Sequence, residues 1–397
     1  MKHGANRVWK KQKEEGKMKK KMVALLAAAV MLVSLLPAAF AADTMDEAAF
    51  RSAVAAGGTV TMTGDVTLTG ALTIDKAVTI DGTASKYSIT YNGSGAAINT
   101  QSNDVLILKN LTLNAAASGG RGVEMFGSAP VITVDGCTLN VNNRGIGTRT
   151  GAPAAGASIT VTNSVIQNSQ LPGGKSYDTW ATVADTRGIS AWNMKSAAVK
   201  VTGSTIQGFG YCINVSGNEN SERIIDTENT TFTITNSHLK GWTTFNVWGA
   251  RSVYNITNTE LLGVNVATGG ANSFATIVVN DDIYKQFDLV HAEANIFNIT
   301  GGSIKNYLSN EAQSANMGEE LIRIDNDGIT RIVFSKNGRA KVDIQDCADC
   351  CESVLYSPVR TAAEMQDYYN SDKLSGEGNC AAVRSDGTTA LPFVPAL

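Results

Sequence analysis

The residues best suited to bind a ligand are arginines and aromatic residues at fixed offsets from short apolar strands. Two residues before one apolar residue of each such strand stand Arg121, Arg144, Arg187, Tyr211 and Thr243. Three residues after it stand Phe126, Arg149, Trp192, Ser216 and Trp248. Guanidinium groups bind carboxylates in a bidentate manner, and flat aromatic rings stack on the apolar faces of sugars. The two sets predict a groove for an anionic or neutral polysaccharide; in the alternative interpretation they are a solvated face with Trp192 or Trp248 under a loop.

Residues for catalysis are less well grouped. The carboxylates near these strands are scattered over the positions Glu124, Asp185, Asp281, Asp282 and Asp325. The chain has three histidines, His3, His238 and His291, and none belongs to a recognisable Ser-His-Asp signature. The sequence therefore predicts no catalytic residue and favours a protein that is not an enzyme.

The six cysteines form two groups. Cys137 and Cys212 occupy strand positions and are interpreted as small buried residues. The other four gather near the C-terminus, at Cys347, Cys350, Cys351 and Cys380. Disulfides are the expected chemistry for such a cluster in a secreted protein, and a zinc site is the alternative. No second Cys pair or His completes a zinc site at the usual spacing, so no metal and no cofactor are predicted.

The elements that must position these residues follow from one pattern, which the chain repeats seven times. Two apolar residues at i and i+2, such as Ile159 and Val161, precede a polar residue and then an Asn or Gly. The period of two is typical of a strand with one buried face. Asn and Gly tolerate positive φ, so they predict a left-handed bend between two strands. The bend positions are Asn110, Gly136, Asn163, Gly203, Asn236, Asn258 and Gly301.

A third short strand follows most bends and carries the apolar reference residue of each turn. These residues are Val123, Ile146, Ile189, Ile213 and Phe245. Three strands per turn, stacked about 4.8 Å from the next turn, form a parallel β-helix. The predicted fold class is all-β, a right-handed single-stranded parallel β-helix with a short N-terminal capping helix. An antiparallel β-sandwich, which also has many short strands, is the alternative.

The repeats resemble the pectate-lyase-like β-helix superfamily. The opening segments 57–65 and 71–82 resemble the start of secreted bacterial surface proteins and adhesins with that fold, and the resemblance covers about residues 44 to 346. It implies a pectin-lyase-like solenoid but no activity, because this fold hosts lyases, hydrolases, tailspikes and adhesins. Lyases of the superfamily use Asp/Glu clusters for calcium with an Arg or Lys base. Polygalacturonases use an Asp pair with Gly-His-Gly; that motif is missing here, so Asp281-Asp282 is interpreted as a solvated loop pair.

The first 41 residues have the composition of a secretory signal peptide. Lysines at 17 and 19–21 precede an apolar run from Met22 to Leu36, and Pro37-Ala-Ala-Phe-Ala41 supplies a cleavage site. A membrane anchor is the alternative, but the run is shorter than a span of about 20 residues requires. The leader carries nine of the 33 Lys and Arg and two of the 36 Asp and Glu, which leaves a mature charge of about −10. An acidic secreted chain is a poor partner for nucleic acid.

The predicted organisation is a signal peptide over 1–41, a capping helix within 42–58, a parallel β-helix over 59–346 and a Cys-containing cap or tail over 347–397. Thr44-Met-Asp-Glu47 matches a capping box, which predicts a helix over 45–56 that covers the open end of the solenoid. A partner-binding helix is the alternative. The sequence favours a secreted or cell-surface, adhesin-like module that binds a polysaccharide or host glycan. A polysaccharide lyase or glycoside hydrolase and a structural spacer are the other functions considered.

Overall fold

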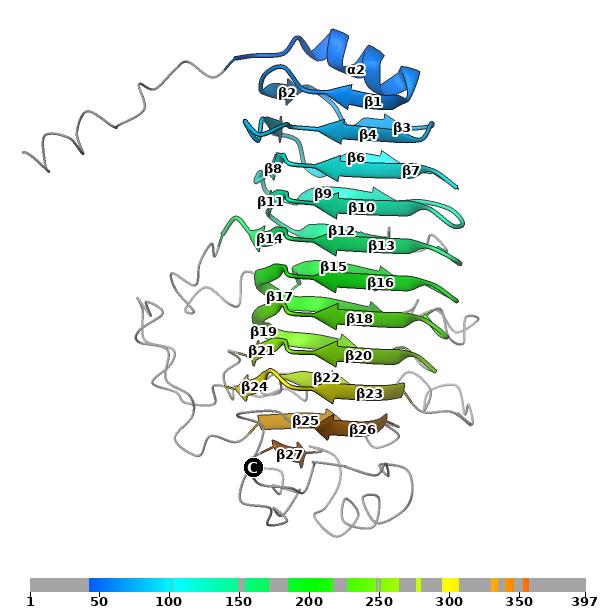
Figure 1. Cartoon of the computed structure of the whole chain (residues 1–397), viewed down its shortest axis with the longest axis vertical. Helices are drawn as coiled ribbons and strands as arrows, with labels where there is room; N and C mark the ends of the chain where they lie inside the picture. Colours follow the sequence, from blue (N-terminus) through cyan, green and yellow to red (C-terminus); the bar gives the residue numbers. More distant parts are fainter. Residues whose placement is uncertain are drawn as a thin grey trace, which may run out of the picture. The chain divides into compact units, whose positions relative to one another are not determined.

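The computed structural model describes residues 43–101, 103–148, 154–170, 185–216, 227–247, 249, 251–263, 276–279, 295–306, 330–334, 340–345 and 353–356. The described residues from Thr44 onward belong to one compact unit. Within the described residues every strand pairing is parallel, from β1 with β4 at one end to β25 with β27 at the other. The fold is a parallel β-solenoid (Figure 1), and the antiparallel β-sandwich considered above is excluded.

The first face of the solenoid is a ten-stranded sheet in which each turn adds one strand beside the last. Its residues alternate between the interior and the outside, as in β10, where Ile132 and Val134 are buried. The strands are β1 (Gly58–Thr61), β4 (Val78–Asp81), β7 (Val105–Lys109), β10 (Val131–Asp135), β13 (Ser158–Thr162), β16 (Ala198–Thr202), β18 (Thr231–Thr235), β20 (Val253–Thr257), β23 (Asn295–Thr300) and β26 (Ala340–Gln345).

The second and third faces are joined, because β17 (Thr205–Ser216) and β19 (His238–Val247) run through both. The second face also contains β2 (Val66–Leu68), β5 (Ser88–Tyr91), β8 (Thr112–Ala115), β11 (Thr138–Val141), β14 (Val165–Asn168), β21 (Glu260–Gly263) and β24 (Ser303–Asn306). The third face also contains β3 (Leu72–Ile74), β6 (Gly95–Thr100), β9 (Gly120–Met125), β12 (Arg144–Thr148), β15 (Arg187–Trp192), β22 (Ile277–Val279), β25 (Thr330–Phe334) and β27 (Ser353–Tyr356). Strand pairing thus continues beyond residue 346, into the segment predicted as a tail.

The bends between the first and second faces lie at the seven predicted Asn and Gly positions. All seven have positive φ, between 47° at Asn258 and 65° at Gly301. The two residue types also fit one another across turns. An added Cβ at Gly203 would lie 2.8 Å from Oδ1 of Asn163 in the preceding turn, so the asparagine side chain fills the space above the glycine. The prediction of left-handed bends is confirmed.

The residues after five of the seven bends form a ladder of hydroxyl groups and one thiol, called here the corner column. Its members are Cys137, Ser164, Ser204, Ser237 and Thr259. The Ser164 hydroxyl accepts a hydrogen bond from the Cys137 N–H at 3.0 Å and donates one to the Thr162 carbonyl at 2.7 Å. The Ser204 hydroxyl serves the Ser164 N–H in the same way, at 3.1 Å. Buried backbone groups at the bend are thereby satisfied by the next turn.

The core is a set of apolar columns that run through successive turns. On the third face the predicted column is confirmed, since the register pairs Val123 with Ile146, Ile189, Ile213 and Phe245 in order, and all are at most 1% exposed. On the first face a later part of the column is aromatic. The rings of Phe232 and Tyr254 stack at 4.7 Å, and those of Tyr254 and Phe297 at 4.2 Å. Such stacking adds about 0.5–1.5 kcal/mol per pair beyond area burial.

The N-terminal end of the solenoid is covered by α2 (Glu47–Ala56), which buries Phe50 and Val54. The N-cap is Asp46, whose side chain accepts from the Ala49 N–H at 2.8 Å, so the prediction of Thr44 as N-cap is wrong. Thr44 instead bridges in parallel to Asp65, an interaction that local sequence does not reveal.

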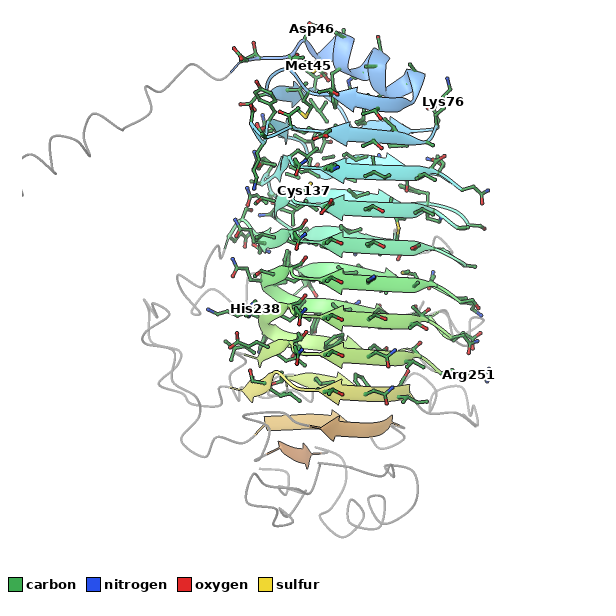
Figure 2. The ribbon with its side chains drawn as sticks, in the orientation of Figure 1. Met45, Asp46, Lys76, Cys137, His238 and Arg251 are labelled. Atoms are coloured by element: carbon green, nitrogen blue, oxygen red, sulfur yellow. The ribbon has the colours of Figure 1, made fainter. Side chains whose placement is uncertain are left out.

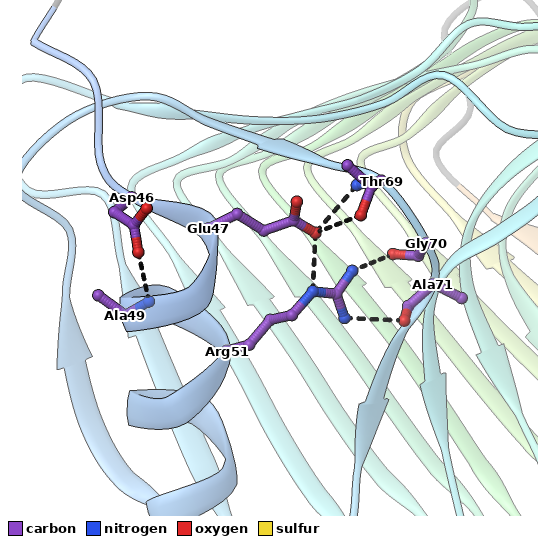
Figure 3. A network of polar contacts seen from close by, with 7 residues as sticks. All are labelled: Asp46, Glu47, Ala49, Arg51, Thr69, Gly70 and Ala71. Atoms are coloured by element: carbon purple, nitrogen blue, oxygen red, sulfur yellow. Dashed lines mark hydrogen bonds and ion pairs between the residues drawn. The ribbon is translucent and has the colours of Figure 1, made fainter.

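A side-chain network fixes this helix on the solenoid (Figure 3). Glu47 Oε1 accepts from Arg51 Nε at 2.7 Å and from the Thr69 N–H at 2.9 Å. Arg51 also donates to the Ala71 carbonyl at 3.0 Å and to that of Gly70. The hydrogen bond from the Thr69 backbone, followed by that from Arg51, lowers the pKa of Glu47. The helix thereby closes an end whose strand edges would otherwise be unpaired.

The predictions for the cysteines and for a membrane span can be compared with the described residues. Cys137, labelled in Figure 2, and Cys212 are both free and buried, as predicted. The Cys347, Cys350, Cys351 and Cys380 cluster lies outside the described residues. Among the residues that are described, no helix has the length and apolar character needed to cross a membrane.

Candidate functional site

Three arginines lie directly above one another on the third face, and they are called here the arginine column. The register pairs Arg121 in β9 with Arg144 in β12, and Arg144 with Arg187 in β15. Tyr211 of β17 follows Arg187, and Thr243 of β19 follows Tyr211. The strands that carry the column are stacked one above another in Figure 1. The sequence-predicted order of these five residues is therefore the order in the structure.

The glycine after each arginine explains why the arginines face outward. An added Cβ at Gly145 would lie 2.4 Å from Cγ2 of the buried Ile166 and 2.5 Å from the Gly188 carbonyl. Gly188 is restricted in the same way by Ile206, at 2.3 Å. The glycine and the buried Val or Ile after it thus both lie on the interior side, which breaks the usual alternation of a strand. The preceding arginine is left on the outside.

The arginine column is short of acceptors for its hydrogen-bond donors. Nε of Arg121, Nε and Nη1 of Arg144 and Nε of Arg187 are shielded from water and have no hydrogen-bond partner among the described residues. An unsatisfied buried donor costs about 1–3 kcal/mol, more for a charged group. The column therefore carries a stability cost that no described residue offsets.

Burial and mutual repulsion both act on these guanidinium groups. Burial, then the charges of Arg187 and Arg121, lower the pKa of Arg144 to about 10, against the opposing effect of Glu124 and Asp185. Burial also lowers the pKa of Arg187, again against Asp185. The central guanidinium thus lies between two like charges in a poorly hydrated environment, where Coulomb interactions are strong.

The guanidinium groups at the two ends of the column each have partners. Nη1 of Arg121 forms an ion pair with Oε1 of Glu124 at 2.8 Å, and the Glu124 side chain is only 5% exposed. Arg187 donates to the Asp185 carbonyl, and its Cζ lies 5.8 Å from the centroid of the Tyr211 ring, within cation–π range. Burial raises the pKa of Tyr211, which therefore stays neutral beside Arg187. Arg144 has no such partner among the described residues.

The second predicted column is only partly described. Phe126 and Trp192 are both half-buried, and Trp192 pairs with Ser216 of the next turn. The Trp192 N–H donates to the Thr148 hydroxyl at 2.8 Å, which fixes the backbone that carries the indole. Arg149 and Trp248 lie outside the described residues. The prediction that aromatic residues accompany the arginine column on this face thus depends on Phe126 and Trp192.

Sequence reasoning missed two features of this face. Trp242 precedes Thr243 in β19, is half-buried, and has an Nε1 without a hydrogen-bond partner among the described residues. Trp242 lies three residues before Phe245, whereas only the residues two before and three after each apolar reference residue were considered. A row of buried polar residues one position after the apolar column was also missed: Glu124, Ser190, Asn214 and Asn246. Asn246 Nδ2 donates to Asn214 Oδ1 at 2.8 Å, so part of the row is a ladder of side-chain amides.

The described acidic groups near this face do not form a metal site. No group of three or more His, Cys, Asp or Glu residues that could hold an ion occurs among the described residues. Asp281, Asp282 and Asp325 lie outside them. His238, labelled in Figure 2, contacts Glu260 at 2.9 Å with its side chain 64% exposed on the second face. Among the described residues, the third face therefore presents cationic and aromatic groups and one buried carboxylate, Glu124.

No protein-family model, no curated protein and no solved structure matches this chain. The geometry of the third face is therefore the main guide to what this protein binds.

Proposed function

We propose that this chain is a secreted, surface-type bacterial protein whose third face binds glycans without cleaving them. Its fold is proposed to be the right-handed β-helix of the pectate-lyase-like superfamily, for which the all-parallel pairing and the seven left-handed bends are the support. Secretion is supported by the composition of residues 1–41. The partner is a polysaccharide or a glycan on a host or cell surface.

The observation that carries the proposed binding function is the stack of three arginines on the third face. Among the described residues, one buried carboxylate, Glu124, forms an ion pair with the column, so its positive charge is only partly offset in this part of the chain. The exposed N–H groups of such arginines are suited to bind acceptor groups of a ligand. The half-buried rings of Tyr211 and Trp192, on the same face, are suited to contact sugar rings.

The direct test is a glycan and polysaccharide array probed with the protein recovered after expression of the full sequence. Every hit is followed by an assay for unsaturated or reducing-end products. We expect binding without products, and a loss of binding when Trp192 and Trp248 are changed to Ala. The matched control is Lys200→Gln, an exposed cation on the first face.

The same assay separates the alternatives. Products from any glycan would make the protein a lyase or hydrolase and direct attention to the region of Asp281. Silence on every glycan would favour a structural spacer. Mass spectrometry of the recovered N-terminus tests secretion independently, since cleavage after Ala41 is expected and an intact leader would contradict it.

A further inference from the structure

We infer that the first face of the solenoid binds ice through the outward side of five successive strands. These strands are β13, β16, β18, β20 and β23, and their outward side is called here the threonine patch. The patch belongs to the ten-stranded sheet, whereas the arginine column belongs to the other sheet. The inference therefore goes beyond the proposed function and does not depend on it.

A column of threonines runs through the patch without interruption. The last outward residue of each of its five strands is a threonine, and the register pairs each one with the next. Val161 and Ile234, which alternate with them, are buried in the core. In β18 the other outward residues, Thr231 and Thr233, are threonines as well. The column consists of Thr162, Thr202, Thr235, Thr257 and Thr300.

The threonines repeat at regular spacings in two directions. Successive turns lie about 4.8 Å apart, and alternate residues of one strand lie about 6.6 Å apart. The described strands of the patch pair without a register shift, whereas the pairing of β17 with β19 shifts between Gln207 and Phe209. Figure 1 shows the five strands running side by side in one direction. Water molecules in ice also repeat in two directions at spacings close to these, so the array matches an ice surface.

The threonine side chain suits this ligand chemically. Its hydroxyl can donate and accept hydrogen bonds, and its methyl group favours the removal of liquid water from the contact. Branching at Cβ restricts χ1, so little side-chain entropy is lost on binding. The backbone carbonyls of Thr162, Thr235 and Thr257 accept from the corner column, but their side-chain hydroxyls have no partner among the described residues. The Thr202 hydroxyl is shielded from water, so that residue does not offer it to a ligand.

The distribution of charge also favours this part of the first face. The outward residues of the patch include one charged residue, Lys200 in β16. Earlier turns of the same face instead carry a column of alternating charge, formed by Asp81, Lys109 and Asp135. Charged groups such as an ammonium are strongly hydrated and resist transfer of their water to a lattice. The threonine patch is therefore the part of the first face that is suited to contact ice.

The high β-propensity of threonine does not by itself explain this pattern. The second face needs residues that suit strands as well, yet its outward positions include Asn140, Gln167 and Gln207 in consecutive turns. Their amides form a ladder, in which Gln207 Nε2 donates to Gln167 Oε1 at 3.1 Å. Outward side chains of the second face thus bond to one another, whereas the hydroxyls of the threonine patch are left to water.

The experiment is ice partitioning of the protein recovered after expression of the full sequence. A dilute solution is frozen slowly from a cold surface, and the protein is measured in the ice and in the remaining liquid. An unrelated soluble protein of similar size is the reference, because growing ice rejects ordinary solutes. We expect this protein to be retained in the ice. Rejection into the liquid to the same extent as the reference would overturn the inference.

Variants test whether the threonine patch makes the contact. Thr233→Tyr combined with Thr235→Tyr keeps β-propensity but interrupts the array, so retention should fall to that of the reference protein. Thr138→Tyr, the same change on the second face, is the matched control and should leave retention unchanged. Lys200→Thr removes the charge from the patch and should increase retention at a freezing rate that retains only part of the wild type. Circular dichroism melts confirm that each variant is folded.

Each result supports or contradicts the assignment. Equal retention of the wild type and the double tyrosine variant would overturn it, because another surface would then make the contact. Retention that falls or stays the same in Lys200→Thr would also overturn it. Glycan binding is measured on a different face and with a different ligand, so failure of the ice experiment leaves the proposed function untouched, and the reverse holds.

Discussion

Two columns of polar side chains run through the stacked turns, and they differ in how their polar atoms are satisfied. In the corner column, each hydroxyl accepts from a backbone N–H of the preceding turn and donates to a carbonyl two residues before it; Ser164 does so at 3.0 and 2.7 Å. In the arginine column, the Nε atoms of all three residues and Nη1 of Arg144 have no partner among the described residues. The repeated hydroxyl residues of the corner column thus satisfy buried backbone groups, whereas the repeated arginines leave some of their own donors unsatisfied.

The residues of the corner column stabilise the fold, whereas the residues of the arginine column are kept in place by the fold at a cost in stability. A satisfied buried hydrogen bond contributes about 1 kcal/mol, while an unsatisfied buried group costs about 1–3 kcal/mol. Removal of a side chain should therefore lower the free energy of unfolding in the corner column and raise it in the arginine column. The largest effect is expected at the backbone that carries the arginine column.

The glycine beside the arginine column should tolerate no side chain. In Gly145→Ala, the new Cβ would lie 2.4 Å from Ile166 Cγ2 and 2.5 Å from a carbonyl oxygen. We expect a loss of about 3 kcal/mol in the free energy of unfolding, measured by urea denaturation. Gly70→Ala is the matched control, because the nearest atom to its new Cβ would be 4.0 Å away. Equal losses in the two variants would show that close packing at Gly145 does not set the geometry of the column.

Cys137 should make the corner column sensitive to alkaline pH. Burial raises the pKa of its thiol from 9.0 to about 11. Above pH 9 the unfolded chain releases this proton while the folded protein keeps it, so stability falls as pH rises from 9 to about 11. Relative to Cys137→Ser, the wild type should lose about 2 kcal/mol over this range, since one pH unit corresponds to about 1.4 kcal/mol.

Cys137→Ser is a suitable reference because serine occupies the equivalent position at Ser164, Ser204 and Ser237. Cys212 is present in both proteins, and its own response cancels in the difference. Parallel stability curves for the two proteins between pH 9 and 11 would contradict the prediction.

Loss of one hydroxyl group from the corner column should destabilise the neighbouring turn. In Ser164→Ala, the buried Cys137 N–H loses its acceptor, and the expected loss of unfolding free energy is about 2 kcal/mol. Ser158→Ala, on the outer side of β13, serves as the control and should change stability by less than about 0.5 kcal/mol. Hydrogen exchange at Cys137 reports the same rung directly and should accelerate in Ser164→Ala alone.

The repeat, the bends and the stacked columns could be predicted because each depends on local residue preference and on counting. Asn163 and Gly203 reveal positive φ without knowledge of their neighbours, and a constant offset from Ile146 or Ile189 places Arg144 and Arg187 in one column. What failed depended on contacts between distant residues. Thr44 matched a capping box, but its pairing with Asp65 moved the N-cap to Asp46.

The same limit explains what was missed on the third face and at the corner. A serine after a bend looks like any small residue until the N–H of the neighbouring turn is known to need an acceptor, as at Ser164. Glu124 and Ser190 are buried next to the buried apolar column, which departs from the simple alternation of a strand. The ligand-binding role of Arg121, Arg144, Arg187, Phe126 and Trp192 stays a prediction.

The smallest and most informative effect is expected at the centre of the arginine column. Arg144→Met replaces a half-buried cation, which has no ion-pair partner among the described residues, by an apolar chain of similar length. Such replacements are often neutral or stabilising by about 1 kcal/mol or more. We expect the unfolding free energy to rise by about 1 kcal/mol, whereas Lys200→Met on the first face should leave it unchanged. The gain should shrink above pH of about 10, because deprotonation of Arg144 in the folded protein removes the same cost. A loss of stability in Arg144→Met would place the arginine column with the corner column, as a part of the fold, and would remove the main support for ligand binding at this face.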